Sequence, residues 1–435
     1  MNIQAIYQLY KEFPTVVTDS RKLEPNSLFF ALKGDNFNGN EYALQALKKG
    51  AKYAIVDQEI DNDNESIIKV DNVLDCLQKL ANFHRNQLSI PIIGITGTNG
   101  KTTTKELLHI VLSKKYNVLA TEGNFNNHIG VPLTLLKITE QHEMAIIEMG
   151  ANHNGEIKDL CKICNPTIGL VTNTGIAHLE GFGSIKNIIK TKSYLYKSVQ
   201  NNSGINFLLT ENENIIDYLG RKYKFIEYSC SNSSINNYGF GNVKDSLLRF
   251  KLVNISGYKG EPISIRTKMI GLYNQTNILA AISISNYFNV NIKQIVSALE
   301  DYTPNNNRSQ LKKTSRNELI LDAYNANPTS VENAIQNFRN IKHSNKILIL
   351  GDMFELGSSS QEQHQKIVEL IRDSNLNSIL IGEAFWKTNI SSPLITKYRQ
   401  LNQVLNSSQI IKISQSLILI KGSRGMQLER LIDSL

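Results

Sequence analysis

The chain has 435 residues, of which 41% are hydrophobic and 20% charged, as is typical of a globular protein with about three domains. No stretch approaches the ~18 apolar residues of a membrane helix, and Met1 to Phe13 lacks the pattern of a signal peptide. The net charge of +8 permits nucleic-acid binding, but the basic residues are scattered, which favours a solvated basic surface. We therefore expect a cytoplasmic protein without membrane insertion and without a nucleic-acid partner.

The four cysteines fit a reducing compartment, where disulfides are rare. Cys161 and Cys164 form a CxxC pair, but no second pair follows and Cys230 stands alone. Zinc binding or redox chemistry is therefore the less favoured interpretation. We expect two buried cysteines on a helix.

The first part of the chain alternates strand and helix patterns. Apolar runs predict strands at 27–32 and 53–56, and helical spacing predicts helices at 42–49 and 73–84. This alternation predicts a small α/β domain.

A glycine-rich turn, Gly94 to Thr104, follows a predicted strand at 90–93 and opens a helical pattern at Thr102. Backbone N–H groups at a helix N-terminus attract phosphate, and a following Lys-Thr pair serves the terminal phosphates and Mg²⁺. The usual pattern places a glycine where this chain has Ile95, and here the glycine falls at Gly97. A chance glycine-rich loop is the alternative, but ATP binding is favoured.

Two more buried strands are predicted at 144–147 and 168–171, each followed by a polar turn. Ligands bind beyond the carboxyl ends of such strands, so we expect Glu148 and Asn173 to face the nucleotide. Glu148 and His178 could hold Mg²⁺, although an imidazole ligand is unusual for that ion, and His178 alone would be read as a loop residue.

The second half of the chain is predicted to contain two different units. Residues 247–268 alternate like antiparallel strands with a turn at Gly257 and Gly260, and a helix is predicted at 277–287. The polar segment 301–307 is predicted to be a linker. Beyond it, strands predicted at 319–321, 347–350, 379–381 and 417–420 indicate a second, mostly parallel sheet. Pro328 suits the first turn of a helix with Asn327 as its N-cap.

Motifs of a known family occur in order along nearly the whole chain. They lie at Thr18 to Lys22, Leu28 to Gly34, Gly94 to Thr104 and Gly123 to Pro132, followed by Glu148, Asn173 and His178. By these motifs the chain resembles the Mur ligases of bacterial cell-wall synthesis. The resemblance implies an α/β fold with three domains: a small N-terminal α/β uridine-binding domain (1–87), a central P-loop parallel-sheet ATPase domain (88–303) and a C-terminal Rossmann-like domain (304–435).

Three further segments resemble the branch of the family that adds D-alanyl-D-alanine: Asp322 to Pro328, Gly351 to Gly357 with His364, and Lys421 to Arg424. Branches that add diaminopimelate or lysine usually carry Asp-Tyr-Ala-His at the first of these positions. The resemblance implies that a carboxylate of UDP-N-acetylmuramoyl-tripeptide attacks ATP to give an acyl phosphate, which D-Ala-D-Ala then attacks. The product would be the pentapeptide precursor of peptidoglycan, made by a monomer.

The resemblance also assigns roles to individual residues. It implies that Lys101, Glu148, His178 and Lys192 are catalytic. Mg²⁺ would be held by Thr102, Glu148, His178 and Lys192, the last as a carbamate formed with CO₂. The implied ATP contacts are Gly97, Thr98, Asn99, Gly100, Lys101, Thr102, Thr103, Asn277, Arg308 and Asp322. The implied contacts to the other substrates are Ser20, Arg21, Asn126, Asn127, Asn325, Ser423 and Arg424.

Several alternatives stay open for these residues and for the function. Lys190 competes with Lys192 for the carbamate, Asn277 could cap a helix, and Arg308 and Asp322 could form inter-domain salt bridges. The chain could also be a P-loop NTPase switch, an amino-acid-adding Mur ligase or a folylpolyglutamate synthetase. A switch would have no use for the motif at Asp19 to Lys22, and the synthetase lacks the N-terminal uridine domain.

Overall fold

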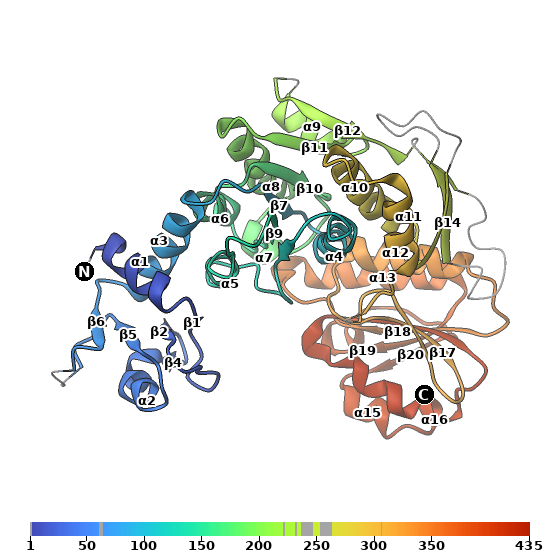
Figure 1. The fold of residues 1–435 in the computed structure, drawn as a ribbon. Helices are drawn as coiled ribbons and strands as arrows, with labels where there is room; N and C mark the ends of the chain where they lie inside the picture. Colours follow the sequence, from blue (N-terminus) through green and yellow to red (C-terminus); the bar gives the residue numbers. More distant parts are fainter. Residues whose placement is uncertain are drawn as a thin grey trace.

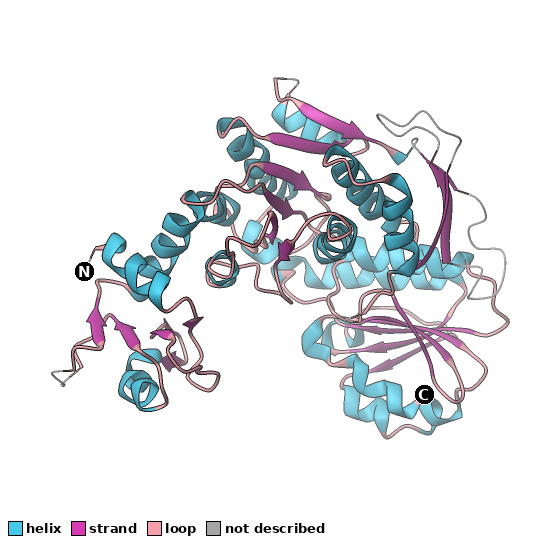
Figure 2. Ribbon diagram, viewed as in Figure 1, coloured by secondary structure: helices cyan, strands magenta, loops and turns pink. Residues whose placement is uncertain are grey.

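The computed structural model describes residues 2–60, 64–220, 222–230, 233–235, 247–252, 263–305 and 307–435. Three parts follow one another along the chain, each built on its own main sheet (Figures 1 and 2). The N-terminal and C-terminal parts both adjoin the central one.

The N-terminal part contains a four-stranded parallel sheet. The sequence predicts an α/β domain here and two of these strands, at 27–32 and 53–56. The strand order of the sheet is β1 (Val16–Val17), β2 (Leu28–Phe30), β5 (Tyr53–Val56) and β6 (Ile67–Lys69). The hairpin β3 (Lys33–Gly34) and β4 (Phe37–Asn38), the 3₁₀ turn η1 (Gly39–Tyr42) and the helices α1 (Ile3–Glu12), α2 (Ala43–Lys48) and α3 (Val73–Asn86) complete it.

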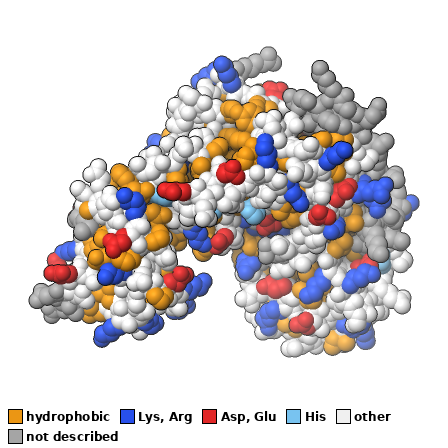
Figure 3. Space-filling view, viewed as in Figure 1, with side chains coloured by type: hydrophobic (Ala, Val, Ile, Leu, Met, Phe, Trp, Pro, Cys, Tyr) orange, Lys and Arg blue, Asp and Glu red, His pale blue; other side chains and the backbone are white. Residues whose placement is uncertain are grey.

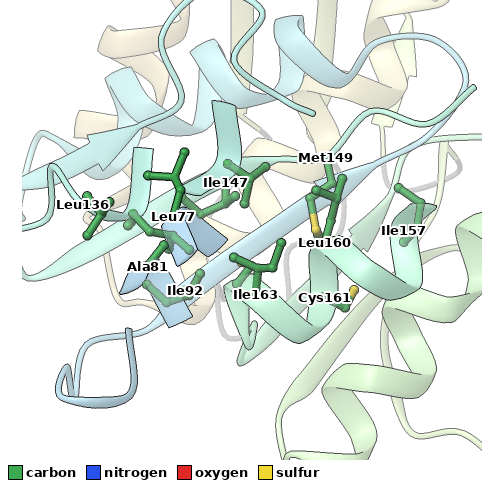
Figure 4. Close-up of a cluster of buried hydrophobic side chains, with 14 of the residues drawn as sticks. Leu77, Ala81, Ile92, Leu136, Ile147, Met149, Ile157, Leu160, Cys161 and Ile163 are labelled. Carbon is green, nitrogen blue, oxygen red and sulfur yellow. The ribbon is translucent and has the colours of Figure 1, made fainter. Parts of the chain in front are cut away.

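Helix α3 joins this part to the central part. Leu77 and Ala81 of α3 belong to one buried cluster with Ile92 and Ile147 of the central sheet (Figure 4). The guanidinium of Arg85 also donates hydrogen bonds to carbonyl oxygens at the end of α6, at 3.1 and 3.0 Å. Since apolar burial is the main favourable term in folding, this shared core fixes α3 against the central part.

The central part is a six-stranded parallel sheet with helices on both faces. Its strand order is β12 (Phe225–Tyr228), β11 (Ile205–Leu209), β10 (Ile168–Val171), β7 (Ile92–Thr96), β9 (Met144–Glu148) and β8 (Val118–Ala120). Its helices are α4 (Lys101–Leu112), α5 (Gly130–Leu135), α6 (Glu156–Cys164), α7 (Leu179–Phe182), α8 (Ile185–Asn201) and α9 (Glu213–Leu219). Strand β7 lies between β9 and β10, which creates the switch point where open α/β sheets bind ligands.

A small antiparallel sheet extends the central part toward the C-terminal part. It contains β13 (Ser233–Ile235), β14 (Leu247–Leu252) and β15 (Ile263–Ile270), and is followed by α10 (Asn274–Tyr287) and α11 (Ile292–Asp301). The predicted antiparallel pair is confirmed. The predicted turn at Gly257 and Gly260 lies outside the described residues.

The C-terminal part has a second, mostly parallel sheet, as predicted. Its order is β16 (Gln310–Lys313), β17 (Glu318–Asp322), β21 (Leu417–Lys421), β18 (Lys346–Gly351), β19 (Asn377–Ile381) and β20 (Ile395–Tyr398), with only β16 antiparallel. Its helices are α12 (Pro328–Asn340), α13 (Ser360–Ser374), α14 (Glu383–Trp386), α15 (Leu401–Leu405) and α16 (Ser408–Lys412), with 3₁₀ turns η4 (Gly357–Ser359), η5 (Arg424–Met426) and η6 (Leu428–Ser434).

Two further expectations, on a helix cap and on the cysteines, are met. Asn327 is the N-cap of α12 and Pro328 its first residue, while Cys161 and Cys164 are buried free thiols on α6. Basic and acidic side chains are interspersed on the face in Figure 3, and no helix in the described part of the chain is long and apolar enough to cross a membrane. The described residues between α11 and β16 form no helix or strand, in keeping with the predicted linker. The positions of the domain boundaries stay a prediction.

Candidate active site

The glycine-rich turn connects β7 to the N-terminus of α4, where the sequence predicts a phosphate-binding loop. Gly97 has φ +147° and Gly100 has φ +81°, and a Cβ at Gly97 would lie 1.9 Å from Thr172 Oγ1. Only glycine fits such a backbone without strain. Lys101 Nζ donates hydrogen bonds to the carbonyl oxygens of Gly97 (2.8 Å) and Thr98 (3.1 Å). These two hydrogen bonds fix the loop backbone around the Lys101 ammonium group.

The carboxylate of Glu148, at the carboxyl end of β9, is buried beside this loop. Its Oε1 accepts hydrogen bonds from Thr102 Oγ1 (3.2 Å) and Asn126 Nδ2 (2.7 Å). Its Oε2 is buried and has no hydrogen-bond partner among the described residues. A buried oxygen left without a partner is costly, and it is a natural ligand for a cation.

Two lysine side chains lie in this region, Lys101 half-buried and Lys192 buried. Burial lowers the pKa of Lys101, and Arg308 lowers it further while Glu148 acts in the opposite direction. Lys192 on α8 is only 2% exposed, and burial together with the charge of Lys101 holds its pKa well below the usual range. Lys190, in contrast, is exposed. The buried position thus distinguishes Lys192 from its competitor.

His178 faces the C-terminal part. It has a left-handed backbone (φ +50°), and its Nδ1 lies 2.5 Å from Glu355 Oε2. The His178 side chain holds the pKa of Glu355 below its usual value by hydrogen bonding, against the effect of partial burial. The described residues contain no group of three or more His, Cys, Asp and Glu side chains placed to hold a metal, and the predicted magnesium set includes only two residues of those types.

A cationic group from the C-terminal part approaches the same region. The Arg308 guanidinium stacks over the Tyr324 ring at 3.7 Å, and its Nε is buried with no hydrogen-bond partner in the part of the chain that the structure describes. Asp322 Oδ2 accepts a hydrogen bond from Lys421 Nζ at 2.7 Å. Asp322 therefore pairs within its own part, and the inter-domain salt bridge considered for it is wrong.

A cavity of about 1300 Å³ lies between these groups and reaches all three parts. The predicted site residues that line it are Thr98, Asn99, Gly100, Lys101, Thr102, Thr103, Asn126, Asn127, Glu148, His178, Asn277, Arg308, Asp322 and Asn325. Asn277 lies inside α10. Its side-chain Oδ1 accepts a hydrogen bond from Thr104 Oγ1, and its Nδ2 donates one to Asn274 Oδ1, so the alternative that Asn277 caps a helix is wrong.

Other predicted residues lie outside the lining of this cavity. Ser423 is buried and accepts a hydrogen bond from Phe354 N, while Arg424 is exposed near Tyr324. Arg21 has an 86% exposed side chain paired with Asp19, and Ser20 lies beside it. Gly97 and Lys192 are not among the residues that line the cavity.

Sequence reasoning missed several lining residues, including Tyr324, Lys421 and polar residues of α12 such as Asn333. Tyr324 and Lys421 fall within motifs that the sequence analysis identified, so their position in these motifs could have indicated that they line the site. For α12, helical spacing indicates a polar face, but it does not indicate that this face lines a cavity rather than facing solvent.

The comparisons with known proteins agree with this geometry. Three family models match: the Mur ligase family catalytic domain at 12–85, the Mur ligase middle domain at 95–285 and the Mur ligase glutamate ligase domain at 307–424. The chain is 33% identical over 437 residues to the UDP-N-acetylmuramoyl-tripeptide–D-alanyl-D-alanine ligase of Bacillus subtilis, with coverage of 97% of this chain and 92% of the relative. It is 31% identical to the same ligase of Escherichia coli (97% and 93% covered).

Solved structures show the same three-part architecture. A crystal structure of MurF from Acinetobacter baumannii superimposes with a TM-score of 0.85 at 27% identity, covering 98% of this chain and 97% of that one. MurF ligase from Thermotoga maritima, solved in complex with ADP, superimposes with a TM-score of 0.84 at 24% identity, covering 97% and 96%. The fold and the phosphate loop define an ATP-dependent α/β ligase, and the chain belongs to the Mur ligase family.

Proposed function

We propose that this Mur ligase joins D-alanyl-D-alanine to UDP-N-acetylmuramoyl-tripeptide at the expense of ATP, giving the pentapeptide precursor of peptidoglycan. The observation that carries the proposal is the match, over almost the whole chain, to ligases with this activity. The site supports it, because the phosphate loop and the C-terminal part face one cavity. An enzyme that uses ATP and a UDP-linked precursor, with four free cysteines, belongs in the cytoplasm.

The first chemical step brings a substrate carboxylate to the γ-phosphate of ATP. Two anions must approach one another, so the site needs fixed positive charge. Lys101 supplies it from the phosphate loop, and Arg308 supplies it from the C-terminal part. The carboxylate oxygen forms a bond to the γ-phosphorus while the bond to ADP breaks, which leaves an acyl phosphate.

The second step is attack on this acyl phosphate by the amine of D-alanyl-D-alanine. The amide bond forms, and phosphate leaves with the oxygen that came from the carboxylate. An acyl phosphate is lost if water reaches it, so the C-terminal part must cover the cavity during the reaction. The contact of Glu355 with His178 serves that covering role.

Oxygen donors around Glu148 suit a magnesium ion. The partnerless Oε2 of Glu148 and the neighbouring Thr102 hydroxyl fit a hard cation, and His178 and carbamylated Lys192 would complete the set. Bound Mg²⁺ would offset the charge of the β- and γ-phosphates. The low pKa of Lys192 supports the carbamate, because only a neutral amine attacks CO₂.

The amine specificity tests the proposal. Phosphate release is measured with ATP, Mg²⁺, UDP-N-acetylmuramoyl-tripeptide and a panel of amines. We expect release with D-alanyl-D-alanine and almost none with free diaminopimelate, lysine or glutamate. A site formed for a dipeptide leaves polar groups unpaired when the second residue is missing, at about 1–3 kcal/mol for each group. Faster release with a free amino acid would overturn the dipeptide assignment.

A further inference from the structure

Two asparagine amides connect the phosphate loop to the C-terminal part. Asn327 Nδ2 donates to Asn99 Oδ1 at 2.8 Å, and Asn99 Nδ2 donates to Asn327 Oδ1 at 3.3 Å. The residues are 228 positions apart in sequence. Each amide thus uses both its donor and its acceptor toward the other, which fixes the relative position of the two groups.

On the phosphate-loop side, Asn99 is held by its backbone as well. Its N–H donates to Asn173 Oδ1 (3.0 Å), and its carbonyl oxygen accepts from Thr172 Oγ1 (2.6 Å) and Asn173 Nδ2 (2.9 Å). The Asn99 side chain therefore projects from a braced point of the loop. A displacement of that side chain would therefore shift the loop backbone, two residues from Lys101.

On the other side, Asn327 is the N-cap of α12. Its Oδ1 accepts from Ser330 N at 2.9 Å, while its own N–H donates to Ser330 Oγ at 3.1 Å. Thr329, in the first turn of α12, also accepts a hydrogen bond from Ile176 N at 3.0 Å. The start of α12 is thereby fixed in direction and placed against the loops that follow β7 and β10.

We infer that Asn327 is a positioning residue, which fixes the phosphate loop through Asn99 when the C-terminal part is docked. The inference rests on the proposed ligase function and adds to it a physical link between docking and phosphoryl transfer. Reactive geometry tolerates little displacement, so a loop held from one side only should transfer the phosphoryl group more slowly.

The capping role of Asn327 can be separated from its role toward Asn99. Asn327→Ser keeps an N-cap side chain that accepts from the backbone, but serine is too short to reach Asn99. Asn99→Ala removes the amide from the other side and leaves the three backbone hydrogen bonds of residue 99 in place. The matched control is Asn291→Ser, the same change at the N-cap of α11, whose side chain bonds only Lys293 N among the bonds described.

The test measures kcat of the full enzyme with saturating substrates, and the dissociation constant of ATP without the other substrates. We expect Asn327→Ser and Asn99→Ala each to lower kcat about three- to tenfold, as loss of a hydrogen bond does. Asn327→Ser should leave ATP affinity within about twofold of wild type, and Asn291→Ser should keep wild-type kcat. The double variant should be no slower than the slower single variant, since both remove one interaction.

Three results would overturn the inference: wild-type kcat in Asn327→Ser, losses that multiply in the double variant, or an ATP affinity of Asn327→Ser that falls as much as its kcat. Melting temperatures identify a variant that fails to fold. If Asn327→Ser does not fold, Asn327→Thr, which also caps a helix and is also too short to reach Asn99, takes its place. Any of these results with an active wild-type enzyme would leave the proposed function standing. An inactive wild-type enzyme would instead remove the proposed function.

Discussion

The ammonium of Lys101 lies where the terminal phosphates of ATP are expected, held by two carbonyl oxygens of its own loop. Lys101→Ala removes this charge without leaving a gap in an apolar core. We expect kcat to fall by about 100-fold or more, as for other groups that stabilise developing charge. Steady-state phosphate release and thermal melting check this together. Near-normal activity in a variant that melts normally would remove the phosphate-loop interpretation.

Lys192 is the second residue on which the chemistry depends. Its burial and low pKa favour a neutral amine that can take up CO₂. We expect Lys192→Ala to lose activity, and Lys192→Glu, or the alanine variant with added acetate, to regain part of it, because each supplies a carboxylate. Lys190→Ala, at an exposed position, serves as the control. A fully active Lys192→Ala enzyme would show that Lys192 carries no carbamate needed for the reaction.

Single residues show where sequence reasoning ends. The resemblance favours Lys192 over Lys190 for the carbamate, but both lie on the helix at 185–201, and only the packing of α8 shows that Lys192 is the buried one. The motifs indicated Ser20 and Arg21 as substrate contacts. They could not predict that these residues lie on an exposed turn, because that depends on how the rest of the N-terminal part folds. The Asn99–Asn327 pair joins residues from different parts, which no local pattern indicates.

At the scale of elements, α3 ties the N-terminal part to the central part, and His84 is one of its contacts. The imidazole Nε2 bonds the carbonyl oxygen of Ile138 at 2.9 Å, and Nδ1 lies 3.3 Å from the Tyr7 hydroxyl. Burial lowers the pKa of His84 below its usual value. As the pH falls below about 6.5, the unfolded chain therefore takes up a proton that the folded chain does not, and stability is lost.

We expect His84→Gln to flatten this pH dependence, by at most about 1.4 kcal/mol per pH unit. Urea unfolding at about pH 7.5 and about pH 5.5 measures it as the change in free energy of unfolding between the two conditions. His128→Gln, at an exposed histidine, should leave the change as in wild type. An unaltered pH dependence in His84→Gln would show that His84 titrates alike in the folded and unfolded chains.

Whole elements could be predicted at many apolar runs and turn signals, although the inner strand β11, with its apolar run at Ile205–Leu209, was missed. The inner strands β17, β18, β19 and β21 and the start of α12 at Pro328 follow directly from the sequence. The edge strands β16 and β20 escaped prediction, because half-exposed strands such as Gln310–Lys313 carry polar residues that read as loop. Edge pairing is set by the neighbouring strand, not by local hydrophobicity.

At the scale of the whole molecule, the three parts meet around one cavity, and the proposed mechanism depends on their being together. The phosphate loop comes from the central part, while Arg308 and Tyr324 come from the C-terminal part. The sequence motifs predict that each part contributes residues to the site. Residues of the predicted motifs from the central and C-terminal parts line the cavity, whereas the N-terminal motifs do not. The motifs could not predict how far the C-terminal part is docked, because that depends on contacts such as Glu355 with His178.

The fate of the tripeptide's carboxylate oxygen tests the central claim most directly. UDP-N-acetylmuramoyl-tripeptide is labelled with oxygen-18 in the reacting carboxylate and turned over with ATP, Mg²⁺ and D-alanyl-D-alanine. Mass spectrometry then follows the phosphate and the product. An acyl-phosphate ligase should give a pentapeptide product and one labelled oxygen in each phosphate released. Unlabelled phosphate, formed at the same rate with or without the two acceptor substrates, would contradict the account and indicate an NTPase that makes no bond.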